Sequence, residues 1–167
     1  RNLPPFRKPV IDRVIRDVAQ ENALLALATA IPAVAPNLPT AGWALGEFAS
    51  DTAVLTMNQV RMAFLIAAAS DREVGYLEQK GQIASIVAGA FGWRSLARKL
   101  ARKIPFGGGL IPKAAIAYAG ACVVGRGLER YYRIGYGLTP GERAEAYRDA
   151  LECGRKFARW ALSREAQ

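Results

Sequence analysis

The chain has 167 residues, a length that suits one domain with a buried core. It carries 23 Lys and Arg against 14 Asp and Glu, and this net charge of +9 favours an anionic membrane surface, nucleic acid or an acidic protein as partner. Histidine is absent, which excludes His-based catalytic triads and His-ligated metals. The two cysteines, Cys122 and Cys153, form no CxxC motif, so we expect no disulfide framework and a reducing compartment.

No stretch of the sequence has the pattern of a signal peptide or of an uninterrupted transmembrane span. The first residues, RNLPPFRKP, lack the apolar run of a secretory signal, and a chain that begins with Arg1 is expected to be a fragment or a processed product. Residues 22–46 carry no charge, but Pro32, Pro36 and Pro39 interrupt them, whereas a spanning helix needs roughly 20 consecutive apolar residues. The sequence still allows a hairpin that is re-entrant or lies in the membrane interface.

The N-terminal third of the chain predicts a helix followed by a break. The helix is expected from Pro9 to about Ala30, after an extended lead, because proline suits a first helical turn and Ile11 and Ile15 recur at helical spacing. The proline-rich segment 31–40 then ends it, since each proline removes a backbone donor and restricts the residue before it.

Two further helix starts are predicted before the middle of the chain. A short helical turn at 41–48 precedes a helix that Ser50 or Asp51 would cap. Another helix is expected to begin directly after Asp71, with Glu73 in its first turn.

The C-terminal half predicts two long helices. A turn rich in glycine, IPFGGGLIP, precedes a helix from about Lys113 to near Gly135. The last helix is expected to start at a capping box of Thr139 and Glu142, with proline at its first position, and to end near Arg164. No useful length of the chain alternates apolar and polar residues as a strand would.

The predicted fold is therefore one all-α domain over residues 1–167, a compact bundle of five or six helices. Small residues recur four apart in two of its segments, which lets helix backbones approach closely. A glycine inside a helix costs ~1 kcal/mol and needs a compensating contact, so we predict that these two small-residue ridges pack on each other as an antiparallel pair. The ridges are Gly81, Ser85 and Gly89, and Ala117, Ala121 and Gly125.

A basic amphipathic segment lies between the small-residue ridges. Its cations fill one half of the helical wheel, opposite Leu96, Leu100 and Ile104. A second basic stripe, with Tyr131 and Tyr132 among its cations, ends the following helix. The candidate contacts for an anionic surface or a partner are Arg94, Arg98, Lys99, Arg102, Lys103, Arg126, Arg130 and Arg133.

The order of these segments resembles a known family. The helices LTMNQVRMAFLIAAAS, IASIVAGAFGWRSLARKLARKIPFGGGLI and AIAYAGACVVGRGLERYYRIG look like the YcjF-type, GTPase-associated helical domain, over residues 22–135. Its members follow or accompany an Era-like GTPase domain in membrane-associated proteins. The resemblance implies a regulatory, membrane-proximal helical module coupled to a GTPase, and it carries over no catalytic residues. Residues 69–74, ASDREV, depart from the family's pattern.

The residues leave several functions open. The leading hypothesis is a non-enzymatic interaction and regulatory module, cytoplasmic or peripheral at the inner face of the membrane, that binds a GTPase domain, a second copy of itself or anionic lipid. The alternatives are an integral or re-entrant membrane domain and a nucleic-acid-binding domain that stacks bases on Tyr131 and Tyr132. Neither Ser85 nor Cys122 has a base within reach by spacing, so we expect no enzymatic activity, cofactor or metal.

Overall fold

Four long helices and one shorter helical segment make up the described part of the protein. The computed structural model describes residues 4–29, 40–85 and 110–165. The long helices are α1 (Pro4–Ala28), α2 (Thr40–Ala69), α4 (Leu110–Ile134) and α5 (Pro140–Glu165), and residues 76–85 are also helical. No strand occurs in these three ranges, so the predicted all-α bundle is confirmed. None of the helices there is both long enough and apolar enough to cross a membrane.

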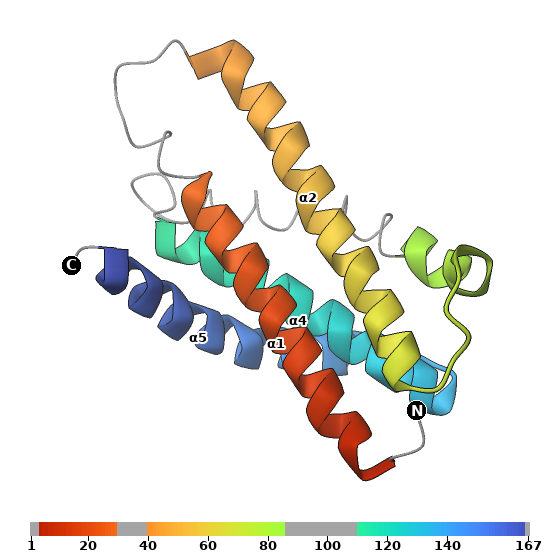
Figure 1. Ribbon diagram of the computed structural model, residues 1–167. Coiled ribbons are helices and arrows are strands. Elements are labelled where there is room, and N and C mark those ends of the chain that lie inside the picture. Colours follow the sequence, from red (N-terminus) through yellow and green to blue (C-terminus); the bar gives the residue numbers. More distant parts are fainter. Residues whose placement is uncertain (1–3, 30–39, 86–109, 166–167) are drawn as a thin grey trace.

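α4 is the central helix of the bundle. It packs against α1, α2 and α5 (Figure 1). One core cluster joins α1, α2 and α4, and Val18, Met62 and Ile66 are among its fully buried side chains. A second cluster joins α1, α4 and α5 and is built mostly from alanines around Leu27. Both core clusters therefore include α4, although α1 also packs directly against α2 and α5.

α1 begins earlier than the sequence predicts. Pro4 and Pro5 lie in its first turn, where their missing N–H groups cost no hydrogen bond, and Pro9 lies inside the helix. An ion pair between Arg7 and Asp71 ties this turn to the end of α2. The expected extended lead is therefore wrong for the described residues that precede Pro9.

α2 is one continuous helix, not a short turn followed by a second helix. It runs from Thr40 to Ala69 and passes through Ser50 and Asp51, the two predicted caps. No proline occurs between Pro39 and the end of α2, so nothing interrupts its backbone hydrogen bonds. The predicted helix start at Ser50 or Asp51 is therefore wrong.

Asp71 ends α2 instead of starting the next helix. Its φ of 56° lies in the left-handed region, and the N–H of Arg72 donates to the carbonyl of Ala67 at 3.0 Å. This is the hydrogen bond of a Schellman C-cap, with Asp71 at the position that glycine usually takes. The next helical segment begins only after Gly75, whose N–H donates to the side-chain oxygen of Gln79 at 2.9 Å. The helix start predicted after Asp71 is therefore wrong.

The connection between α4 and α5 contains the predicted capping box and a glycine that ends α4. Gly135, with a φ of 87°, ends α4, and its N–H donates to the carbonyl of Tyr131 at 2.8 Å. The N–H of Thr139 donates to the Glu142 carboxylate at 2.9 Å, and the N–H of Glu142 donates to the Thr139 hydroxyl at 3.4 Å. Arg130 of α4 also forms an ion pair with Glu142, so this turn is fixed from both helices.

Candidate functional site

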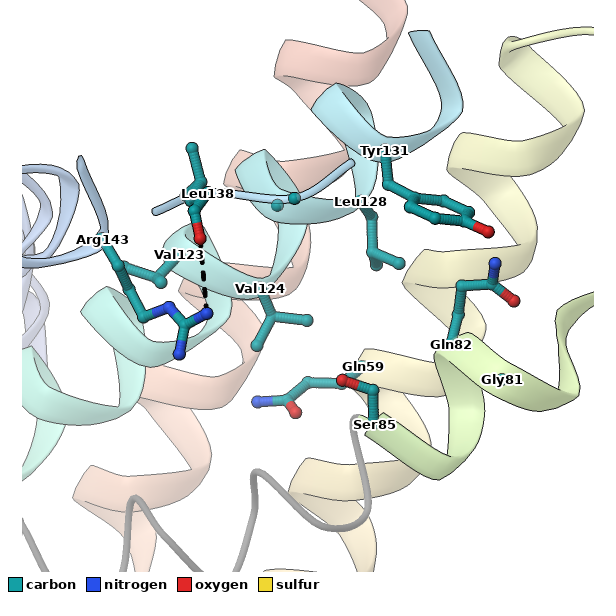
Figure 2. A pocket seen from close by; sticks show the side chains of 12 residues that line it. Gln59, Gly81, Gln82, Ser85, Val123, Val124, Leu128, Tyr131, Leu138 and Arg143 are labelled. Atoms are coloured by element: carbon teal, nitrogen blue, oxygen red, sulfur yellow. Dashed lines mark hydrogen bonds between the residues drawn. The ribbon is translucent and has the colours of Figure 1, made fainter. Parts of the chain in front are cut away.

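A groove separates the helical segment 76–85 from α4. Its inner cavity has a volume of about 490 Å³, within the ~300–1,000 Å³ that small-molecule sites occupy. Figure 2 shows that side chains from α2, from 76–85 and from α4 surround this cavity. The residues that line it are Gln59, Gly81, Gln82, Ser85, Val123, Val124, Gly127, Leu128, Tyr131, Gly137, Leu138 and Arg143.

The two sides of the inner cavity differ in polarity. α4 contributes an apolar side, which includes Val124 and Leu128. On the other side, Gln59, Gln82 and Ser85 present two amides and a hydroxyl (Figure 2). The Oε1 atom of Gln82 is buried and accepts no hydrogen bond within the described residues. The guanidinium of Arg143 adds one positive charge to the lining. Because amides and hydroxyls both donate and accept, the cavity suits a group that is partly apolar and partly polar.

A second cavity, of about 510 Å³, continues the groove, because Gln82 and Tyr131 line both cavities. Gln79 lies in it and is only 2% exposed. Its Nε2 donates to the carbonyl of Glu73 at 2.6 Å, and its Oε1 accepts from the N–H of Gly75. Gln79 therefore positions the start of the segment 76–85, which forms one side of the groove.

Large apolar side chains are exposed near the start of the segment 76–85 and near the end of α4. Val74, Tyr76 and Leu77 are 49%, 69% and 72% exposed on one side. Tyr131 and Ile134 of α4 are 40% and 42% exposed. We call these five residues the apolar rim. Three of the five lie within residues 74–77, and Tyr131 lines both cavities. Grouped exposed apolar side chains mark interaction sites more often than single ones do.

Arg126, a predicted surface contact, is paired with two carboxylates, although 41% of its side chain is exposed. It pairs with Asp12 of α1 and donates to Glu129 at 2.8 Å. Burial raises the pKa of Asp12, but the hydrogen bonds from Arg126 and Lys8 outweigh it and hold that pKa below its usual value. The guanidinium of Arg126 therefore joins α4 to α1 and is not free to meet an anionic partner.

Arg130 is likewise engaged, by Glu142 and by the ring of Tyr136, whose centroid lies 5.4 Å from the guanidinium carbon. The backbone N–H of Thr139 and the Arg130 guanidinium lower the pKa of Glu142 to about 2. Arg133 is exposed and forms no ion pair with any residue that the structure describes. The remaining predicted contacts lie outside the described residues: Arg94, Arg98, Lys99, Arg102 and Lys103.

The small-residue ridges do not meet as predicted. A Cβ at Gly125 would lie 2.6 Å from Cγ1 of Ile15 and 3.1 Å from Sδ of Met62, so the close approach there is to α1 and α2. A Cβ at Gly81 would meet nothing within 4 Å, and Ser85 lines the groove. The predicted partner of the α4 ridge is therefore wrong for these residues. Of the other ridge positions, Ala121 is buried in the core, Ala117 is half-buried and Gly89 lies outside the described residues.

Tyr131 and Tyr132 do not form a platform of two exposed rings. Tyr132 is 6% exposed and belongs to the core, and burial raises its pKa to about 12. Its ring lies edge-on to that of Tyr131, with 5.7 Å between the centroids. Only Tyr131 is left with an accessible ring for a nucleic-acid base, which removes half of the predicted stacking surface.

Two features of the surface were missed by reasoning from the sequence. The groove draws its lining from α2, from 76–85, from α4, from the turn before α5 and from Arg143 of α5, and no sequence pattern links these segments. The other is an exposed basic face on α5, whose signal is present in the sequence as cations at four-residue spacing. This face consists of Arg155, Lys156, Arg159, Trp160 and Arg164.

Within residues 4–29, 40–85 and 110–165, no group of three or more Cys, Asp or Glu side chains is placed to hold a metal ion. Comparison of the chain with models of protein families, with curated proteins and with solved structures finds no match. Its function therefore has to be inferred from its own residues and their geometry.

Proposed function

We propose that the protein is a non-enzymatic helical module that binds an anionic membrane surface and holds another protein in the groove between residues 76–85 and α4. A GTPase domain is the first protein partner to test, because the chain resembles the YcjF-type helical domain. Charge supports the membrane part of this proposal, and the apolar rim supports the protein part.

The membrane part of the proposal rests on an excess of positive charge that internal ion pairs cannot neutralise. With a net charge of +9, nine cations would remain even if every carboxylate were paired. Each cation near an anionic leaflet contributes ~1 kcal/mol to binding, and a few that face the same way give measurable affinity. Because salt screens binding of this kind, weaker binding at high salt is its diagnostic.

The protein part is supported by the apolar rim beside the groove. Tyr76 and Leu77 are the most exposed of its side chains and follow the Schellman cap at Asp71 by only a few residues. Buried aromatic and aliphatic anchors supply most of the affinity of protein interfaces. A partner that covers the rim would bury these side chains and present a polar group to Gln59 and Gln82 in the inner cavity.

Vesicle flotation tests the membrane part. The purified chain is mixed with vesicles of phosphatidylcholine alone or with added phosphatidylserine, at low and high salt. We expect flotation only with phosphatidylserine, and less of it at high salt. Equal flotation with both vesicles, or none with either, contradicts the proposal. A variant with Arg94, Arg98 and Arg102 changed to Glu reports how much the basic amphipathic segment contributes.

Site-specific photo-crosslinking tests the protein part. A benzoylphenylalanine in place of Leu77 is compared in cells with one in place of Arg148, an exposed residue of α5 away from the groove. We expect a GTPase domain to be linked from position 77 and not from position 148. A link to a second copy of the chain would show self-association instead. Identical products from the two positions would rule out the groove as the docking site.

A further inference from the structure

The two halves of α5 differ in charge. From Pro140 to Glu152 the helix carries four acidic and two basic residues, whereas from Cys153 to Glu165 it carries four basic residues and one acidic residue, the terminal Glu165. Among the described side chains, only Arg155 of these four cations has an acidic neighbour, Glu152, at 3.8 Å. The C-terminal half of α5 thus keeps most of its positive charge unneutralised.

A tryptophan lies among these cations on the same side of the helix. Lys156, Trp160 and Arg164 follow one another at intervals of four, and Arg155 and Arg159 form the adjacent row. Trp160 is 52% exposed although it is the largest side chain of α5. The guanidinium carbon of Arg164 lies 5.3 Å from the centre of its ring. Together these five residues form the α5 basic face.

The opposite side of α5 is anchored, so this face cannot turn inward. A Cβ at Gly154 would lie 2.9 Å from Cβ of Tyr118 and 3.0 Å from the backbone of Ala115, which shows how closely α5 approaches α4. Ala158 and Ala161 are buried in the cluster with α1 and α4. Because these small residues hold the opposite side of α5 against α1 and α4, the α5 basic face is left exposed.

The helix macrodipole accounts for cations near the C-terminal end of α5, but it does not account for the exposed tryptophan. An indole has an apolar body and one N–H donor, a combination that is enriched where membrane meets water. Cations on the same face attract anionic headgroups. The guanidinium of Arg164 lies over the ring of Trp160 and so keeps charge and indole together on this face.

We infer that the α5 basic face docks on an anionic phospholipid bilayer, with its cations on the headgroups and the indole of Trp160 in the interface. The inference rests on the proposed membrane function and names the surface that performs it. The α5 basic face takes the place of Arg126 and Arg130 as the expected lipid contact, because carboxylates of the bundle hold those two guanidiniums.

Vesicle flotation with α5 variants tests the inference. A Lys156→Glu/Arg159→Glu variant is expected to lose at least about tenfold in affinity for vesicles that contain phosphatidylserine, and Trp160→Ser at least about fivefold. The matched control, Arg16→Glu/Arg148→Glu, makes the same change in net charge at exposed positions outside the face and is expected to lose much less. Circular dichroism establishes that each variant keeps its helices.

Tryptophan fluorescence provides a test that leaves α5 unchanged. With Trp43 and Trp93 replaced by Phe, Trp160 is the only tryptophan of the chain. Its emission is expected to shift to shorter wavelength with phosphatidylserine vesicles, and brominated lipid is expected to quench it. Neither change is expected with phosphatidylcholine alone.

The outcomes separate the two proposals. If the wild type floats but the α5 variants float equally well and Trp160 emission stays unchanged, the α5 basic face is not the lipid contact and the membrane function stands. If the wild type does not float, both proposals fail. If single-stranded nucleic acid, and not vesicles, shifts the Trp160 emission, the face binds nucleic acid and the lipid inference is overturned.

Discussion

The side-chain amide of Asn58 donates a hydrogen bond of 2.9 Å to Oδ1 of Asn22, joining α2 to α1 inside the bundle. Asn22 is 1% exposed, and its own Nδ2 has no partner within the described residues. Beside this pair, Arg61 and Glu21 form an ion pair at 2.9 Å. A buried amide pair fixes the register of two helices more than it stabilises them, because any other register leaves both amides unpaired.

The first prediction concerns this amide pair. Asn58→Ala leaves both polar groups of the Asn22 side chain buried without partners, so we expect the free energy of unfolding to fall by about 1–3 kcal/mol. Changing both residues to Leu replaces two polar groups with apolar ones and is expected to cost less than the single Ala change. Urea unfolding measures both. A larger loss in the double variant would contradict this account of the pair.

Gly125→Ala is expected to destabilise the protein. Its new Cβ would lie 2.6 Å from Cγ1 of Ile15 and 3.1 Å from Sδ of Met62, which forces a shift that costs about 1–3 kcal/mol and outweighs the better helix propensity of alanine. Gly120→Ala in the same helix is the control, because its Cβ would meet nothing within 4 Å. That change is expected to stabilise by up to about 1 kcal/mol. Equal effects of the two in thermal unfolding would refute the packing argument.

Gly154→Ala is expected to cost more than Gly125→Ala. The atoms that crowd position 125 belong to the movable side chains of Ile15 and Met62, whereas those at position 154 include the backbone of Ala115 at 3.0 Å. Backbone atoms cannot move without separating α4 from α5, and over-packing of this kind costs about 3 kcal/mol or more. Chemical denaturation of the two variants side by side gives the order. The reverse order would mean that the contact between α4 and α5 accommodates an added methyl group more easily than the contact of Gly125 with Ile15 and Met62.

The lowered pKa of Glu142 predicts that the folded protein loses stability in acid. The N–H of Thr139 and the Arg130 guanidinium lower its pKa to about 2 in the folded chain, whereas the ordinary value is 4.5. A group whose pKa is lower in the folded state stabilises fully above its unfolded pKa. That stability is lost as the pH falls from about 4.5 towards 2. Asp12, whose pKa is also lowered, acts in the same direction.

Glu142→Gln isolates the contribution of this carboxylate. Glutamine still completes the capping box but does not titrate, so the variant is expected to be less stable at neutral pH and to lose less stability in acid than the wild type. The measurement is the denaturation midpoint at pH 7 and pH 3. Glu145→Gln on the same helix is the control and is expected to follow the wild type. Parallel losses in all three proteins would show that Glu142 does not carry the effect.

The two free thiols are expected to react at different rates. Burial raises the pKa of Cys122 to about 11, whereas Cys153 is exposed. Because the thiolate is the reactive form, Cys122 should react slowly with Ellman's reagent at pH 8 and Cys153 quickly. Cys153→Ser should abolish the fast phase and Cys122→Ser the slow phase. A fast phase that persists in Cys153→Ser, where Cys122 is the remaining thiol, would mean that α4 opens readily.

Local signals in the sequence predicted the helices and their well-defined ends. Ile11, Ile15 and Val18 were expected on one face of α1 and are buried together, and the capping box of Thr139 and Glu142 is present. These signals depend on residues within one or two turns of each other. The end of α2 was missed because Asp71 takes a left-handed conformation, which a carboxylate residue adopts far less often than glycine.

The site could not be predicted in the same way, because its interactions join distant residues. Arg126 was expected at the surface, but its partner Asp12 lies 114 positions earlier in the chain. Arg130 pairs with Glu142 across the turn into α5. A helical wheel separates the charged side of a helix from the apolar side, but it does not say which charged side chains neighbouring helices will neutralise. The same holds for the groove between Gln59, Gln82 and Leu128.

The position of α4 in the chain has a consequence for synthesis. α1 is complete 81 residues before α4 begins, although much of its apolar side packs against α4. At ordinary rates of translation this interval lasts roughly 4–16 s. During that time the growing chain holds Ile15 and Val18 without the helix that finally covers them. α5, by contrast, follows α4 after a five-residue turn and can pair with it at once. Of the four long helices, α1 is therefore made first but is among the last to be fully covered, so chaperones have the longest access to it.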